Sequence, residues 1–125
     1  MEKLMYPLWK PTAQGSDDFR DALLQASQAL SQVADVRAIR LCVADSAVAP
    51  AAARRIENHV PVPDAMLSLW VDFAGAAANW EPLIDDCVDR KCAYLVAEAE
   101  PLVNQARHPS LPGERVYGMC HVVFM

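Results

Sequence analysis

The sequence predicts an α+β domain in which one antiparallel sheet carries helices on one face, and two features lead to this fold class. The first is the segment 65–73, AMLSLWVDF, whose side chains alternate with the period of two that is typical of a strand. One predicted face is wholly apolar and is expected to pack against helices: Leu67, Leu69, Val71 and Phe73. The opposite face mixes a thioether, a hydroxyl, an indole and a carboxylate, as the wall of a partly enclosed cavity would: Met66, Ser68, Trp70 and Asp72. The second feature is the alternation of strand-like and helix-like segments along the chain.

Length and composition restrict the possible classes of protein. The chain has 125 residues, which predicts one folding unit, and its 54% hydrophobic and 22% charged content is typical of a globular protein. A net charge of −5 argues against a nucleic-acid partner, because a phosphate-binding face needs clustered Lys and Arg, and Arg54-Arg55 is too short a cluster. The longest apolar run falls short of the roughly 20 residues of a membrane span. The first residues lack the layout of a signal peptide, so we expect a cytoplasmic protein without a membrane partner.

The cysteines predict neither a metal site nor a disulfide framework. Cys42, Cys87, Cys92 and Cys120 form no C-x-x-C pair, and the spacing of Cys87 and Cys92 is not that of zinc ligands. We expect free thiols in a reducing compartment. The chain also has no Gly-rich phosphate loop and no Ser-His-Asp set, so no cofactor is expected.

The first half of the chain predicts two strands and two helices before the cavity strand. Residues 3–10 are expected to form the first strand, although Pro7 cannot donate to a ladder and is tolerated only at a bulge or an unpaired position. A helix is predicted from Ser16 to about Val33, with apolar residues at steps of three and four. Residues 36–44 predict a second strand and 48–58 a short Ala-rich helix.

The second half completes the pattern. We expect a helix from Asn79 to about Lys91, a fourth strand over 93–103, and, after the unit of residues 1–104, a linker and an extra terminal strand within 105–125. The order predicts a ferredoxin-like sandwich with a four-stranded antiparallel sheet. The face away from the helices would hold Trp9, Cys42, Met66 and Trp70, which is too apolar to be left in water. We therefore expect this sheet to pack against that of a second copy, forming a dimeric α/β barrel.

Three stretches of the chain resemble the EthD-like family of the dimeric α/β-barrel superfamily. They are KLMYPLW at 3–9, SDDFRD at 16–21, and AYLVAEAEPLV at 93–103 followed by PGERVYG at 112–118. The resemblance implies a homodimer, or the pairing of tandem repeats, with an inter-sheet cavity for a small apolar or aromatic compound in a degradative pathway. It also implies that Met119–Met125 repeats the opening strand. Many members carry a His late in the first helix, and Ser27 stands at that position here.

Two residues are candidates for acid–base chemistry. Asp72 shares the cavity face with Trp70, and a carboxyl group beside an indole in an apolar pocket can have a raised pKa. The alternative, which we favour, is an ion pair between Asp72 and Arg40 on the neighbouring strand. His59 precedes the cavity strand and is within sequence reach of Asp64; it is either a general base or, as we favour, an exposed loop residue.

A further set of residues is predicted to contact the ligand. Tyr6, Trp9 and Trp70 would form an aromatic wall, and the remaining members of the set are Ser27, Arg40 and Met66. Three functions then compete: a binder of apolar compounds, a cofactor-free oxygenase, cyclase or isomerase, and a non-catalytic dimerisation module. An open cavity with Asp72 directed at Trp70 would favour the second, and a cavity filled by side chains the third.

Overall fold

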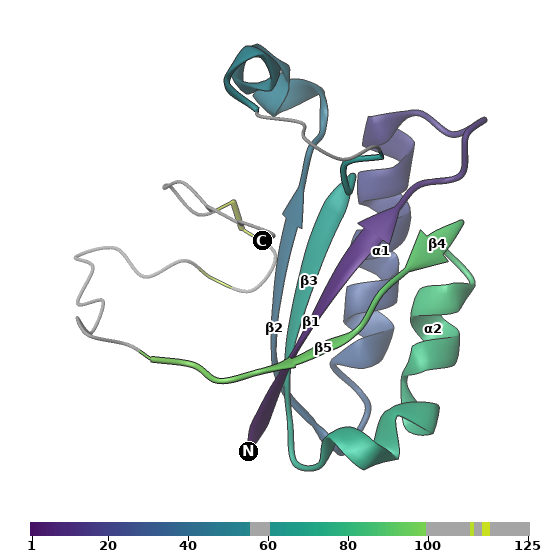
Figure 1. The fold of residues 1–125 in the computed structure, drawn as a ribbon. Helices are drawn as coiled ribbons and strands as arrows, with labels where there is room; N and C mark the ends of the chain where they lie inside the picture. Colours follow the sequence, from purple (N-terminus) through teal and green to yellow (C-terminus); the bar gives the residue numbers. More distant parts are fainter. Residues whose placement is uncertain (56–60, 100–110, 112–113, 116–125) are drawn as a thin grey trace.

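Two helices lie against one face of an antiparallel sheet in the computed structural model, which describes residues 1–55, 61–99, 111 and 114–115 (Figure 1). The helices are α1 (Ser16–Leu30) and α2 (Glu81–Asp85), and two 3₁₀ helices are η1 (Ser46–Arg54) and η2 (Ala74–Asn79). Several predictions fall outside the described residues: His59, Cys120, the unit boundary near 104 and, apart from Arg115, the terminal strand expected over 115–125.

The sheet has the strand order of a ferredoxin-like sandwich. Its strands are β1 (Glu2–Trp9), β2 (Val36–Val43), β3 (Ala65–Val71), β4 (Arg90–Lys91) and β5 (Tyr94–Val96). They are arranged β2-β3-β1, with β4 and β5 both paired to the other side of β1, and every pairing is antiparallel. Together β4 and β5 occupy the place of the predicted fourth strand, so the predicted fold class is confirmed.

Pro7 lies in the central strand β1, and the break between β4 and β5 explains why it is tolerated there. The Pro7 carbonyl accepts from the Cys92 backbone N–H at 3.2 Å, so the edge of Pro7 that lacks a donor faces this side. Lys91 is the last residue of β4 and Tyr94 the first of β5, which leaves the neighbouring strand interrupted opposite the proline. A missing N–H therefore costs no ladder hydrogen bond.

The helices differ from the sequence prediction mainly at their ends. Helix α1 buries Phe19, Leu23 and Leu30, as its apolar period predicted. The prediction that the second helix continues to about Lys91 is wrong, because α2 ends at Asp85. Beyond this point the backbone pairs with β1 instead: the Asp89 N–H donates to the Trp9 carbonyl at 2.9 Å and Lys91 lies opposite Leu8. Tertiary pairing has replaced local helix formation.

The core lies between the sheet and the helices. Leu67, Leu69 and Val71 face it as predicted, but Phe73 is 64% exposed because β3 ends at Val71. Tyr6 belongs to the same core and is fully buried. The predicted aromatic wall of Tyr6, Trp9 and Trp70 is therefore wrong: β1 alternates, and its core-facing side carries Tyr6 with Leu4 and Leu8.

A buried hydrogen-bond chain links β1 to α2. The Trp80 indole N–H donates to the Tyr6 hydroxyl at 3.0 Å, and that hydroxyl donates to Glu81 Oε1 at 3.3 Å. Burial raises the pKa of Tyr6 to about 12, so the phenol stays protonated as a donor.

Replacing Tyr6 by phenylalanine is expected to lower the free energy of unfolding by roughly 1–2 kcal/mol, because the buried Trp80 N–H loses its acceptor. Urea denaturation measures this. In a Trp80→Phe background the same change should cost clearly less, because the donor is already absent. Equal costs in the two backgrounds would show that the hydrogen bond does not contribute.

Candidate functional site

The face of the sheet opposite α1 and α2, here called the helix-free face, carries a regular array of side chains. Its three rows follow the strand registers and are Ala38–Trp70–Lys3, Arg40–Ser68–Met5 and Cys42–Met66–Pro7. Of the predicted ligand contacts, the structure brings Arg40, Met66 and Trp70 together here. Met66 and Ser68 are almost fully buried and Trp70 is half-buried.

Charged groups surround the Trp70 indole. Lys3 Nζ lies 4.5 Å from the ring centroid and Arg40 Cζ lies 5.9 Å from it, both within the range of cation–π attraction. The indole N–H donates to Glu98 Oε2 at 2.7 Å, and Lys3 Nζ pairs with Glu98 Oε1 at 2.8 Å. These two hydrogen bonds, from Lys3 first and Trp70 second, hold the pKa of Glu98 below its usual value. The carboxylate is therefore charged at neutral pH.

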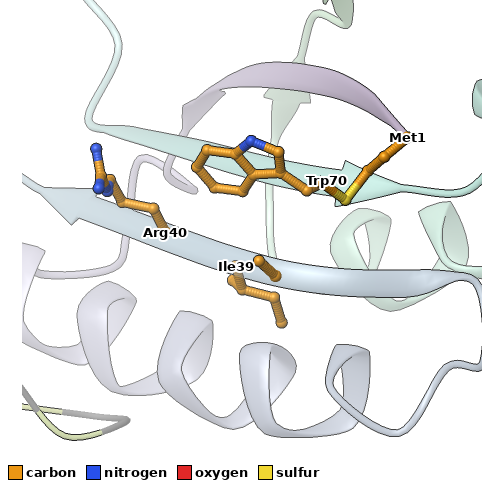
Figure 2. A pocket seen from close by; sticks show the side chains of 5 residues that line it. Met1, Ile39, Arg40 and Trp70 are labelled. Atoms are coloured by element: carbon orange, nitrogen blue, oxygen red, sulfur yellow. The ribbon is translucent and has the colours of Figure 1, made fainter. Parts of the chain in front are cut away.

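A surface pocket of about 360 Å³ adjoins the indole at the β2 edge of the sheet. Met1, Ala38, Ile39, Arg40 and Trp70 line it. Figure 2 shows the indole in the middle, with Arg40 near one end of it and Met1 near the other, while Ile39 points towards the helix layer. Apart from the Arg40 guanidinium, the lining side chains are aliphatic, thioether or aromatic, and Met1 also carries the N-terminal ammonium group. The pocket therefore suits a small and largely apolar molecule.

Asp72 forms an ion pair, as favoured, but with a different arginine from the one predicted. Arg37 Nε donates to Asp72 Oδ1 at 2.8 Å, and Arg37 Nη2 contacts the other carboxylate oxygen. A β-bulge between Val36 and Ala38 makes Arg37 the extra residue and turns it towards Asp72, whereas Arg40 stands opposite Ser68.

This pairing also determines the charge of Asp72. The hydrogen bond from Arg37 lowers the pKa of the Asp72 carboxyl, and its side chain is 43% exposed. The expectation of a raised pKa in an apolar pocket is therefore wrong, because an exposed carboxylate beside a guanidinium favours its charged form.

The other predicted residues lie apart from the pocket. Trp9 is at the far end of β1, where its N–H donates to the Pro61 carbonyl at 3.1 Å and Arg90 lies 4.6 Å from its ring centroid. Ser27 is half-buried in α1, on the opposite side of the sheet from Trp70, so it does not reach the helix-free face. The prediction that Ser27 shares a cavity with Trp70 is wrong for that reason.

Sequence reasoning missed two residues that contact Trp70. Lys3 could have been found, because alternation along β1 places it on the same face as Met5 and Trp9. Glu98 carried no signal, since it reaches Trp70 from a segment beyond β5, 28 positions away in the chain.

A second charged cluster lies at the end of β2 and was also missed. The Asp45 carboxylate is almost completely covered, and it accepts from Arg20 Nη1 at 3.1 Å and from Arg115 Nη2 at 2.9 Å. It also accepts from the Ala47 backbone N–H at 3.1 Å and so caps η1. The hydrogen bond from Arg115, above all, lowers the pKa of Asp45.

Two negative findings apply to the part of the chain that the structure describes. There, no three His, Cys, Asp or Glu side chains are placed to hold a metal ion together. In the same residues, no helix combines the length and apolar character needed to span a membrane.

Comparison with known proteins supports the fold and gives no activity. No protein-family model matches the chain, and no curated protein sequence matches it. Among solved structures, the chain is similar to a dimeric ferredoxin-like protein of unknown function from Thermobifida fusca, with a TM-score of 0.50 and 7% identity. The match covers 78% of this chain and 90% of that one. At this identity the similarity shows the ferredoxin-like fold.

Proposed function

We propose that this protein is a small-molecule binder of the EthD-like type, which pairs with a second copy through its helix-free face and holds an apolar or aromatic compound beside Trp70. The observation that carries the proposal is the pocket at the indole, whose lining side chains are apolar except for that of Arg40. A degradative role, a cytoplasmic location and a repeat beginning near residue 119 stay predictions.

Pairing with a second copy is supported by the character of the helix-free face. Met5, Cys42 and Trp70 lie on it only half-buried, which gives it more accessible apolar side chain than an ordinary solvated sheet face has. The ferredoxin-like neighbour in Thermobifida fusca is itself described as dimeric. Two copies of such a sheet, packed face to face, would close the pocket from solvent.

Binding without catalysis is favoured over a cofactor-free oxygenase, cyclase or isomerase. Acid–base catalysis near neutral pH needs a group whose pKa lies near that pH. Asp72 is instead ionised and held by Arg37, and Ser27 stands on the wrong side of the sheet. His59 lies outside the described residues and is left as the one predicted base.

Replacing Trp70 by alanine tests the proposal. We expect the affinity for a neutral aromatic probe, 2-naphthylmethanol, to fall on the order of tenfold, because the flat apolar wall of the pocket is lost. Light scattering should also show a shift from dimer towards monomer, while far-ultraviolet circular dichroism should stay unchanged because the indole lies outside the core.

Phe73→Ala is the matched control, since Phe73 is an exposed aromatic beyond the end of the same strand. Phe73→Ala should leave both the oligomeric state measured by light scattering and the probe affinity as in the wild type. If Trp70→Ala also preserves both, neither pairing nor binding involves this face.

A further inference from the structure

The charges on the two sides of Trp70 are not balanced in the same way. On the β1 side, the Lys3 ammonium is neutralised by Glu98 at 2.8 Å. On the β2 side, Arg40 has no carboxylate within ion-pair distance among the described residues. It lies against the indole, and its charge also helps to lower the pKa of Glu98. Of the other charged groups near this edge, Arg37 and Asp72 neutralise each other. Lys3 and Arg40 thus both act on the one Glu98 carboxylate, and the Met1 ammonium lies at the same edge, close enough to lower the pKa of Asp72. Positive charge therefore exceeds negative charge around the indole.

Two of these positive groups, the Arg40 guanidinium and the Met1 ammonium, belong to residues of the pocket lining. Arg40 lines the pocket at one end of the indole, and Met1 lines it at the other end (Figure 2). A guanidinium presents a planar array of N–H donors that matches a carboxylate, and it binds such a group in a bidentate manner. An apolar pocket with one guanidinium at its rim complements a molecule with a flat apolar body and a single negative group.

The Glu98 contact supports the same chemistry from within the chain. Its carboxylate already sits against the Trp70 ring edge and a cation, which demonstrates that an anion is stable beside this indole. The indole N–H is fully used by Glu98, so a second anion on the β2 side would depend on Arg40.

We propose that the Trp70 pocket selects an aromatic or cyclic carboxylate, with the ring against Trp70 and Ala38 and the carboxylate on the Arg40 guanidinium. This inference rests on the proposed binding function and adds the class of ligand. The pocket's volume of about 360 Å³ is at the lower end for ligand pockets, which suits a compound of one or two rings.

The test compares two probes that share a ring system and differ in charge: 2-naphthoate and neutral 2-naphthylmethanol. Wild-type protein should bind 2-naphthoate about tenfold more tightly, as a charge-assisted hydrogen bond at a partly exposed site provides. Arg40→Gln should remove that preference and leave the affinity for the alcohol unchanged. Isothermal titration calorimetry measures both constants.

Arg37→Gln is the matched control, because Arg37 lies on the same strand and is exposed but is paired with Asp72. It should keep the preference for 2-naphthoate. A loss of preference equal to that of Arg40→Gln would overturn the assignment to Arg40 in favour of a general charge effect.

Three other outcomes separate this inference from the function on which it rests. If wild-type protein binds the alcohol as tightly as 2-naphthoate, the carboxylate selection is overturned and the binding function stands. If it binds neither probe, both fall. If Arg40→Gln lowers the mass measured by light scattering and leaves both affinities unchanged, Arg40 contacts a second copy instead of a ligand, and the inference is overturned.

Discussion

Replacing Trp80 by alanine is expected to lower the free energy of unfolding by roughly 3–5 kcal/mol, the cost of deleting a fully buried aromatic side chain. Trp80 is fully buried in the core between the sheet and the helices, immediately before α2, and its N–H bonds to Tyr6 on β1. The substitution therefore leaves a cavity and removes the Trp80–Tyr6 hydrogen bond, one of the links between the start of α2 and the central strand. A domain of this size has about 5–15 kcal/mol of stability, so a large share would be lost.

Urea denaturation followed by circular dichroism measures this change through the transition midpoint. Trp80→Phe should cost markedly less, because it keeps a six-membered aromatic ring in the core and loses the five-membered ring that carries the N–H. Trp9→Ala is the control for loss of an indole as such, since Trp9 is only half-buried at the end of β1. Similar midpoints for Trp80→Ala and Trp9→Ala would contradict the assignment of Trp80 to the core.

Asp45→Asn is expected to destabilise the protein by roughly 1–3 kcal/mol at pH 7, because a covered carboxylate with charged partners is lost. This loss of stability is smaller than the loss expected for a deeply buried ion pair, because the Arg20 and Arg115 side chains are 29% and 60% exposed. The same carboxylate joins α1, the start of η1 and residue 115, so its loss loosens three parts of the chain.

The pH dependence of this effect has a defined sign. The pKa of Asp45 is lowered in the folded protein from an ordinary value of 3.8, so its contribution is complete above that value and disappears as the pH falls through the folded-state pKa. The stability difference between wild type and Asp45→Asn should therefore be constant between pH 5 and 7 and shrink below about pH 4.

Urea midpoints at pH 7 and pH 3 check this expectation. Asp21→Asn is the control, because Asp21 also pairs with Arg20 but is well exposed, and its removal should have little effect at either pH. A difference between wild type and Asp45→Asn that stays the same at both pH values would rule out the ionised carboxylate as its source.

The sequence by itself determined the main strands, the first helix and their order. Apolar residues at steps of three and four identified α1 from Ser16, and the alternation of side chains identified β2 and β3 with their core-facing sides. Each pattern reflects which of a few neighbouring residues are buried. The order of these elements then led to the ferredoxin-like sandwich, and Trp70 and Arg40 were placed on the face where they lie. Alternation along β1 also separates Tyr6 from Trp9, so the error in the aromatic wall came from grouping residues by type.

Only the tertiary structure decided which partners these side chains have. The bulge at Arg37 makes that residue, and not Arg40, the ion-pair partner of Asp72. The break between β4 and β5 allows Pro7 in a central strand, and Glu98 contacts Trp70 from a segment beyond β5. Each depends on the register between segments distant in the chain. Local periodicity is set by the burial of near neighbours and carries no information on that register, so the charge balance around Trp70 emerges only when the strands are paired.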